Sequence, residues 1–230
     1  MKKILLCLLL LFSLNGCVQT HAWKYTSETK KYTPPTTALE VIVPPMRDIR
    51  KNKNGARATA WLGLIPGVPY SKNQVHETPE WSPLILNNMK VSEDLAIATA
   101  QEINAASIFK NAYFDFNPQK GDLILEGTIK KFRIKTYTAF YGCSFLGVYL
   151  WYFGLPAGKI HNDVIIEFQL KDKQGKSYFQ KEYTAHTDYL QGLYYNLKTA
   201  DFEPLVKEIN LKLLQDLQTV APQIRLKKGK

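Results

Sequence analysis

The stretch Val164-Ile165-Ile166-Glu167-Phe168-Gln169-Leu170 decides the fold class, because its apolar side chains recur at every second position with Glu167 and Gln169 between the later ones. A period of two is typical of a β-strand that buries one face against a core. Lys173-Gln174-Gly175 follows directly and supplies turn residues. We therefore predict a hairpin whose second strand covers residues 177–185.

The segment before this hairpin has the same period with one break. Leu123, Leu125 and Ile129 share one face at odd positions, whereas after Lys130-Lys131 the apolar side chains occupy even positions, at Phe132 and Ile134. If the strand is to keep its apolar side chains on the core side, one extra residue must compensate for this change of phase. We predict a β-bulge at Lys130-Lys131.

The other elements follow from shorter patterns. We expect residues 71–88 to be irregular. We also expect the hydroxyl of Ser92 to cap the amino terminus of a helix. The remaining predicted elements are strands at 39–43, 58–64 and 112–116, a helix from Ser92 to Phe109, and an amphipathic helix at 202–220 ended by Pro222. This order predicts an α+β fold, an antiparallel or mixed sheet with two helices packed on one face, plus a long aromatic insertion between two strands.

The amino terminus has the pattern of an export signal. Met1-Lys2-Lys3 precedes the apolar run Ile4–Leu14. At about 1.5 Å per residue this run is too short for a helix to cross a hydrocarbon core of about 30 Å. We expect residues 1–16 to be removed during export.

Leu14-Asn15-Gly16-Cys17 resembles the lipobox of bacterial lipoproteins, although Asn15 departs from the small residue that is common there. The resemblance implies S-diacylation of Cys17, cleavage just before it and acylation, with palmitate-type chains, of the new amine. Val18-Gln19 lacks the Asp that retains enteric lipoproteins at the inner membrane, which favours the periplasmic face of the outer membrane. An ordinary secretory signal with a stray cysteine is the alternative.

The rest of the chain divides by composition. Residues 17–38 are rich in Thr and carry Pro34-Pro35, which predicts a lipidated, flexible tether. Residues 39–222 form the predicted α+β domain, and residues 223–230 a basic tail.

The element order, the lipobox and the pair Asp48-x-Arg50 after the first strand resemble the small α/β domains of YajG-type envelope lipoproteins and of the amino-terminal domain of TolB. The resemblance implies a non-catalytic member of an envelope assembly.

No charged residue stands between Lys135 and Lys159, in a span that reads TYTAFYGCSFLGVYLWYFGLPAG. Its glycines and Pro156 weaken a membrane-spanning helix, and Tyr and Trp prefer membrane interfaces. Two other interpretations stay open, a buried cover over a sheet face and a protruding loop that docks on a membrane or a partner. Trp61–Gly67 has a similar texture, and two such loops at one end of a sheet would share an apolar surface. The candidate contact residues are Phe145, Tyr149, Trp151, Tyr152, Phe153 and Trp61.

Composition limits the function classes. With 45% hydrophobic residues the chain is not wholly disordered. The loss of Lys2 and Lys3 reduces the net charge from +10 to +8. For an exported protein this excess favours anionic envelope surfaces, and we expect no nucleic-acid partner.

Catalytic patterns are weak. His161-Asn162-Asp163 and His186-Thr187-Asp188 each place a histidine two residues from an aspartate, without a recognisable nucleophile. No metal-type spacing occurs, and Cys143 reads as a small buried residue. We expect a binding protein that is not an enzyme and uses no cofactor. The alternatives are a channel-like oligomer that inserts residues 137–158 into the membrane, and a hydrolase that uses His186 and Asp188.

Overall fold

The computed structural model describes residues 23, 25–27, 29, 35–50, 62–77, 89–196 and 202–224. In this part of the chain a seven-stranded mixed sheet has the order β4-β1-β5-β6-β7, and β2 and β3 also pair with β5. The strands are β1 Glu40–Val43, β2 Arg47–Asp48, β3 Tyr70–Glu77, β4 Asn111–Phe114, β5 Leu123–Ala139, β6 Gly158–Asp172 and β7 Ser177–Gln191. The helices are α2 Val91–Ala106, α3 Tyr149–Tyr152 and α4 Glu203–Val220, with 3-10 turns η2 Pro118–Lys120, η3 Ser144–Val148 and η4 Ala221–Gln223.

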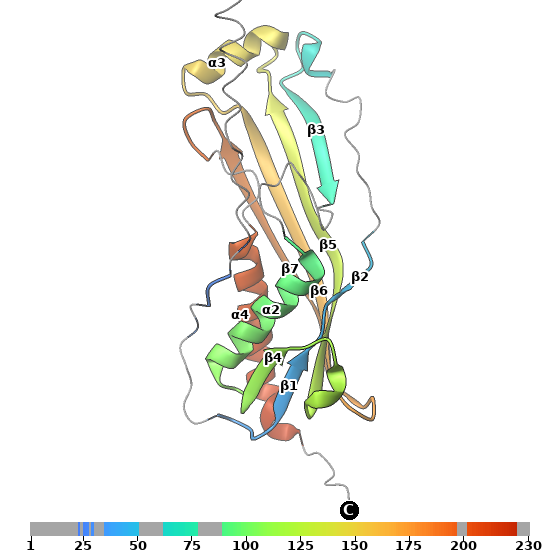
Figure 1. The fold of residues 1–230 in the computed structure, drawn as a ribbon. Helices are drawn as coiled ribbons and strands as arrows, with labels where there is room; N and C mark the ends of the chain where they lie inside the picture. Colours follow the sequence, from blue (N-terminus) through green and yellow to red (C-terminus); the bar gives the residue numbers. More distant parts are fainter. Residues whose placement is uncertain are drawn as a thin grey trace, which may run out of the picture.

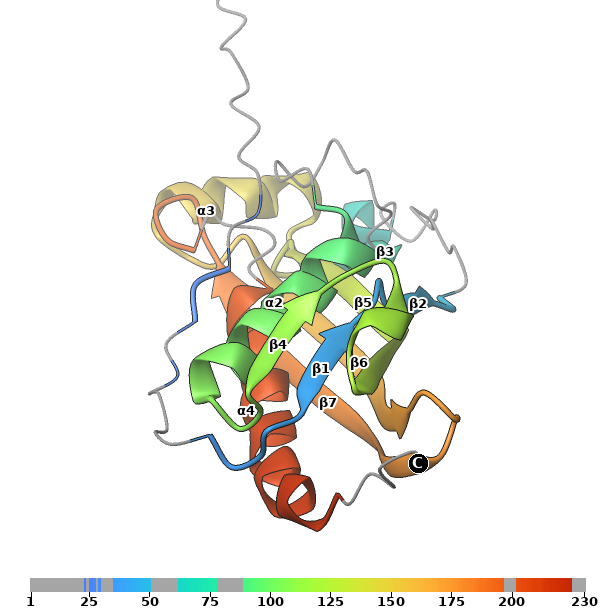
Figure 2. The same ribbon diagram turned by 60° about the horizontal axis from the view of Figure 1, so that its bottom comes forward.

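The sheet has two regions, which Figure 1 shows one above the other. In the lower region, the body, α2 and α4 pack against each other and cover one face of the sheet, α2 over β1 and β4 and α4 over β7 (Figure 2). In the upper region, the ribbon, β5, β6 and β7 continue beyond the helices and β3 pairs with β5. The predicted α+β class, with a mixed sheet and two helices on one face, is confirmed.

The alternating stretch of β6 forms the centre of the core. Val164, Ile166, Phe168 and Leu170 are each at most 1% exposed. Their cross-strand neighbours in β5 and β7 include Phe132, Ala185 and Tyr183, which are also buried. The predicted hairpin is confirmed, because β6 ends at Asp172 and β7 begins at Ser177.

The predicted bulge is also confirmed. Ile129 pairs with Ile166 and Lys131 with the adjacent Ile165, so Lys130 is the extra residue of β5. The bulge keeps Phe132 on the core side, where its ring stacks on that of Phe202 with centroids 4.0 Å apart. Strand β5 can therefore run from the body into the ribbon without turning its apolar side chains outward.

Three local predictions are wrong. Residues 71–77, expected to be irregular, belong to β3. Residues 62–64, expected in a strand, form a 3-10 turn, and residues 58–61 lie outside the described residues. Ser92 does not cap α2, since the helix begins at Val91, the Ser92 hydroxyl donates to the carbonyl of Met46, and the helix ends at Ala106.

The described residues of the expected tether lie on the body. Trp23 and Tyr25 pack against the core cluster. The Tyr25 hydroxyl donates to Oε1 of Glu102 in α2 at 2.7 Å and accepts from Nδ2 of Asn210 in α4 at 3.2 Å. Burial, with the neighbouring Glu102 carboxylate, raises the pKa of Tyr25 despite its hydrogen bond from Asn210. The flexible tether is therefore corrected at these positions to a docked segment.

Residues 1–22, including Cys17, and the basic tail at 225–230 lie outside the described residues. The ordered body extends to Ile224, which is 8% exposed, two residues beyond the predicted boundary at 222. Among the described residues no helix is both long and apolar enough to cross a bilayer.

Candidate docking apex and the pocket beneath it

Three segments meet at the free end of the ribbon, and we call them together the apex. They are residues 62–70, residues 140–157 and residues 192–196 (Figure 1). The strands take residues 136–139 and 158 of the uncharged run, so only 140–157 leaves the sheet. This connection contains η3 and α3 and joins the neighbouring strands β5 and β6.

The first two segments are joined mainly by backbone hydrogen bonds. The amides of Phe140 and Tyr141 donate to the carbonyl of Pro69 at 2.7 and 3.0 Å, and the amide of Gly67 donates to the carbonyl of Gly142 at 2.8 Å. The Ser144 hydroxyl donates to the carbonyl of Leu64 at 2.6 Å. The structure thus brings together the two apolar loops of similar texture, as far as it describes them. Trp61 lies outside the described residues.

The connection from β5 to β6 has its own internal supports. Trp151 is partly buried, and its Nε1 donates to the carbonyl of Ala139 at 2.9 Å. Gly147 lies so close to the backbone of Phe140 that a Cβ there would overlap the Phe140 carbonyl group. These contacts seat η3 and α3 on the end of β5.

Four of the predicted contact residues point into solvent. Phe145, Tyr149, Tyr152 and Phe153 are between 62% and 80% exposed. The buried-cover interpretation is therefore wrong for these side chains, which project beyond the sheet instead of covering it. Further exposed apolar side chains of the apex and the adjoining strand ends are Leu62, Leu64, Ile65, Tyr70, Leu146, Leu155, Leu190, Leu193 and Tyr194. A cluster of this kind is typical of a docking surface.

Cys143 also differs from its prediction. Its thiol is free and the residue is exposed, not buried. Cys143 lies in the turn between the end of β5 and η3, outside the sheet.

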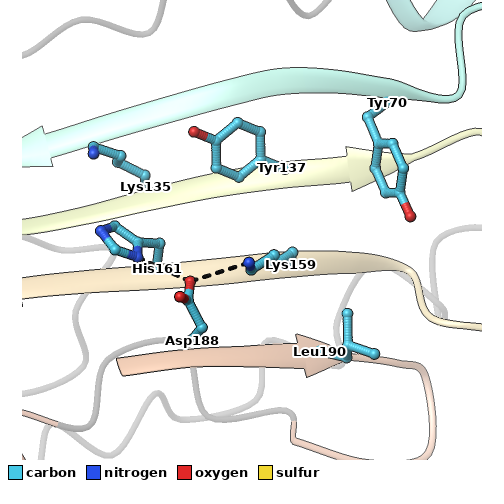
Figure 3. A pocket seen from close by; sticks show the side chains of 7 residues that line it. All are labelled: Tyr70, Lys135, Tyr137, Lys159, His161, Asp188 and Leu190. Carbon is cyan, nitrogen blue, oxygen red and sulfur yellow. Dashed lines mark hydrogen bonds and ion pairs between the residues drawn. The ribbon is translucent and has the colours of Figure 1, made fainter. Parts of the chain in front are cut away.

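Directly beneath the apex, one face of the ribbon holds a pocket of about 550 Å³. Its lining side chains come from four adjacent strands and point to the same side (Figure 3). They are Tyr70 of β3, Lys135 and Tyr137 of β5, Lys159 and His161 of β6, and Asp188 and Leu190 of β7. This volume is sufficient for a small ligand or a headgroup.

The carboxylate of Asp163, below the pocket, forms ion pairs with several cationic side chains. Oδ2 of Asp163 lies 2.9 Å from Lys131 Nζ, 3.0 Å from Arg133 Nη2 and 3.5 Å from Lys135 Nζ. Oδ1 of Asp163 lies 2.7 Å from Nε2 of His161. Burial alone would raise the pKa of Asp163, but the hydrogen bonds from Lys131 and Arg133 and the charge of His161 outweigh it and lower the pKa strongly.

A second carboxylate lies inside the pocket. Asp188 Oδ1 lies 2.8 Å from Nδ1 of His161 and 3.4 Å from Nζ of Lys159. Partial burial opposes the ionisation of Asp188, yet the bonds to His161 and Lys159 lower its pKa. Asp188 thus bonds His161, and not the His186 with which the hydrolase interpretation paired it.

The chemistry available here is that of charge and hydrogen bonding. A histidine between two carboxylates has a fixed ring orientation, as a general base requires. The described lining residues include no Ser, Thr or Cys that could serve as a nucleophile. Among the described residues no group of His, Cys, Asp and Glu has the arrangement of a metal site.

The pocket was not anticipated from the sequence, although a signal was present. Lys135 and Lys159 are the charged residues that flank the uncharged run, and the pairing of β5 with β6 brings them to one end of the ribbon. The antiparallel pairing of two strands joined by that run would have predicted their proximity. The chain matches no known protein-family model, and no curated protein is significantly similar to it.

Proposed function

We propose that this chain is a lipid-anchored protein of a bacterial envelope that acts by binding, with the apex as its docking end. The observation that carries the proposal is the cluster of aromatic side chains at the apex, 62–80% exposed at Phe145, Tyr149, Tyr152 and Phe153. Such a surface costs solubility unless another surface covers it. The apex is attached to the ends of four strands, and a site held by strands is better suited to recognition than a site on a loose loop.

The anchor of the proposal is Cys17. The lipobox-like residues support it, as does the analogy of the α+β body to small envelope lipoprotein domains. Trp23 is docked on the body, so the six residue steps from Cys17 to Trp23 span at most about 20 Å. On this proposal the body lies close to the anchoring bilayer, facing the periplasm at the outer membrane.

The anchor is tested by mass spectrometry of the amino-terminal peptide of the protein isolated from its own membranes. The proposal expects a peptide that begins at Cys17 and carries acyl chains, and it expects Cys17→Ser to move the protein into the soluble fraction. An unmodified amino terminus, with unchanged fractionation of the variant, would overturn the anchor.

The docking end is tested by photo-crosslinking in native membranes. A photoreactive residue replaces Phe153 of the apex, and the matched control replaces Phe116, which is 67% exposed on the body. We expect a defined adduct from position 153, with a lipid, an identified envelope protein or a second copy, and none from position 116. Equal adducts from both positions, or intramolecular products only, would contradict the proposal.

A further inference from the structure

The apex and the pocket form two zones of different chemistry along the ribbon. The described segments 62–71, 136–158 and 189–196 contain no charged residue. The first charged residues below them are Lys72 on β3, Lys135 on β5, Lys159 on β6 and Asp188 on β7. An uncharged aromatic end is thus followed on three of four strands by a lysine.

The two pocket lysines, Lys135 and Lys159, form only long ion pairs with their carboxylate partners. Lys135 Nζ lies 3.5 Å from Asp163, which Lys131 and Arg133 already reach at 2.9 and 3.0 Å. Lys159 Nζ lies 3.4 Å from Asp188, which His161 reaches at 2.8 Å. Figure 3 shows the Lys159 ammonium group directed at Asp188 and the Lys135 ammonium group on the side of the pocket away from Tyr70.

The balance of charge is positive. Four cationic side chains, Lys131, Arg133, Lys135 and Lys159, surround the two carboxylates of Asp163 and Asp188. The formal surplus of two positive charges stands beside an open cavity of about 550 Å³. A partly desolvated cationic pocket attracts an anion.

We infer that the apex docks on a membrane surface of anionic phospholipids, with its aromatic side chains at the boundary of headgroups and acyl chains and a headgroup phosphate between Lys135 and Lys159. This inference rests on the proposed role of the apex and names the surface that it binds. Tyr and Trp concentrate at this boundary of a bilayer, and lysines beside an apolar segment extend their ammonium groups to the phosphates.

The distances along the strands agree with this placement. Lys159 is one residue from the apical end of β6 and Lys135 four residues from that of β5, or about 3 and 13 Å at the rise of a strand. Amphipathic elements that lie in a membrane surface bury about 5–10 Å of their apolar side. The apex can therefore enter the boundary while the lysines stay at the level of the headgroups.

The test is flotation of the mature chain, residues 17–230 with Cys17→Ser, which lacks both the apolar run Ile4–Leu14 and the acyl chains and leaves every described contact in place. Vesicles contain phosphatidylcholine alone or phosphatidylcholine with phosphatidylglycerol. Four proteins are compared: this parent, Phe153→Ser, the double variant Lys135→Gln/Lys159→Gln, and the matched control Lys110→Gln/Lys120→Gln, which removes two lysines that are 62% and 58% exposed on the body.

We expect the parent to bind the phosphatidylglycerol vesicles and to bind phosphatidylcholine at least about tenfold more weakly. The pocket variant should lose roughly fivefold in affinity per lysine, the control less than twofold, and Phe153→Ser should bind more weakly on both vesicles. Equal binding to both lipids, equal losses in the pocket variant and the control, or no flotation would overturn the inference.

An added arm separates a lipid phosphate from a free one. Flotation in the presence of glycerol 1-phosphate should be unchanged, because this small molecule lacks the acyl chains that the apex contacts and therefore binds the pocket too weakly to compete. Binding of glycerol 1-phosphate without flotation would show a soluble ligand and overturn the inference. A defined protein adduct at position 153 combined with no flotation would overturn the membrane surface and leave the proposed docking role intact.

Discussion

The hydroxyl of Tyr25 donates a 2.7 Å hydrogen bond to Oε1 of Glu102, 77 positions later in the chain. Glu102 is 2% exposed, and its other oxygen accepts from the hydroxyls of Ser27 and Thr29. The described hydrogen-bond donors to this buried carboxylate thus all come from the amino-terminal segment. Tyr25, Ser27 and Thr29 are therefore held on the helical face of the body.

Tyr25→Phe should lower the free energy of unfolding by about 1–2 kcal/mol, because it removes one donor from a buried carboxylate and leaves Asn210 without its acceptor. Urea denaturation followed by circular dichroism measures the change. Tyr149→Phe is the matched control, since Tyr149 is 62% exposed. Equal stability of Tyr25→Phe and the parent would show that the segment is not held by this contact.

Deletion of Lys130 should leave folding cooperative and cost no more than about 2 kcal/mol, because Ile129 and Lys131 already pair with the adjacent Ile166 and Ile165, so β5 without the extra residue keeps Phe132 on the core side. Lys130→Ala removes only exposed ion pairs with Glu167 and Glu182 and should leave the urea midpoint nearly unchanged. The comparison separates the extra backbone residue from its side chain. Loss of cooperative folding on deletion of Lys130 would contradict the assignment of Lys130 as the extra residue of the bulge.

Asp163→Asn should lower stability near neutral pH by about 1–3 kcal/mol, because three cations lose their shared carboxylate. The folded state lowers the pKa of Asp163, so its contribution is complete above the ordinary pKa near 3.8 and is lost as the pH falls toward the lowered value. Urea denaturation from neutral pH to about pH 3 should show the parent losing more stability than the variant. Parallel curves would contradict this assignment.

Gly147→Ala should loosen the apex and leave the body folded, because its Cβ would overlap the carbonyl group of Phe140. Hydrogen exchange of peptides that cover residues 141–154 should accelerate by at least about tenfold, with little change in β6 and α4. Phe145→Ala is the matched control, since its side chain is 63% exposed. Unchanged exchange in both regions would show that the close approach does not hold η3 in place.

The parts of the fold with a strong internal period were predictable. The alternation at Val164–Leu170 gave β6, and the break after Ile129 gave the bulge, because each one-residue slip would expose a whole apolar face. Strand β3 was missed, since Ser71–Glu77 carries Val75 as its one apolar residue and is held by backbone pairing with β5. A polar edge strand has no periodic apolar signal.

The candidate site was predictable in composition but not in exposure. Aromatic side chains such as Phe145 and Phe153 suit a buried cover and a projecting apex equally well. They are exposed because β5 and β6 extend beyond the end of α4, so that no described helix lies over the connection between these strands. Ser92 and Cys143 were misjudged for a related reason. Their local sequence gives no indication that Met46 offers a carbonyl to the first or that the second lies at the end of the ribbon.

The proposed docking role is tested on the exposed thiol of Cys143, which lies in the apex itself. A thiol-reactive maleimide probe is applied to the native lipidated protein in its own membranes and after transfer to detergent, with Phe116→Cys in a Cys143→Ser background as the control on the body. We expect Cys143 to react at least about tenfold more slowly in the membranes than in detergent, while position 116 reacts equally in both. Equal rates at Cys143 would show that the apex is uncovered in its natural setting and would contradict the proposed docking role.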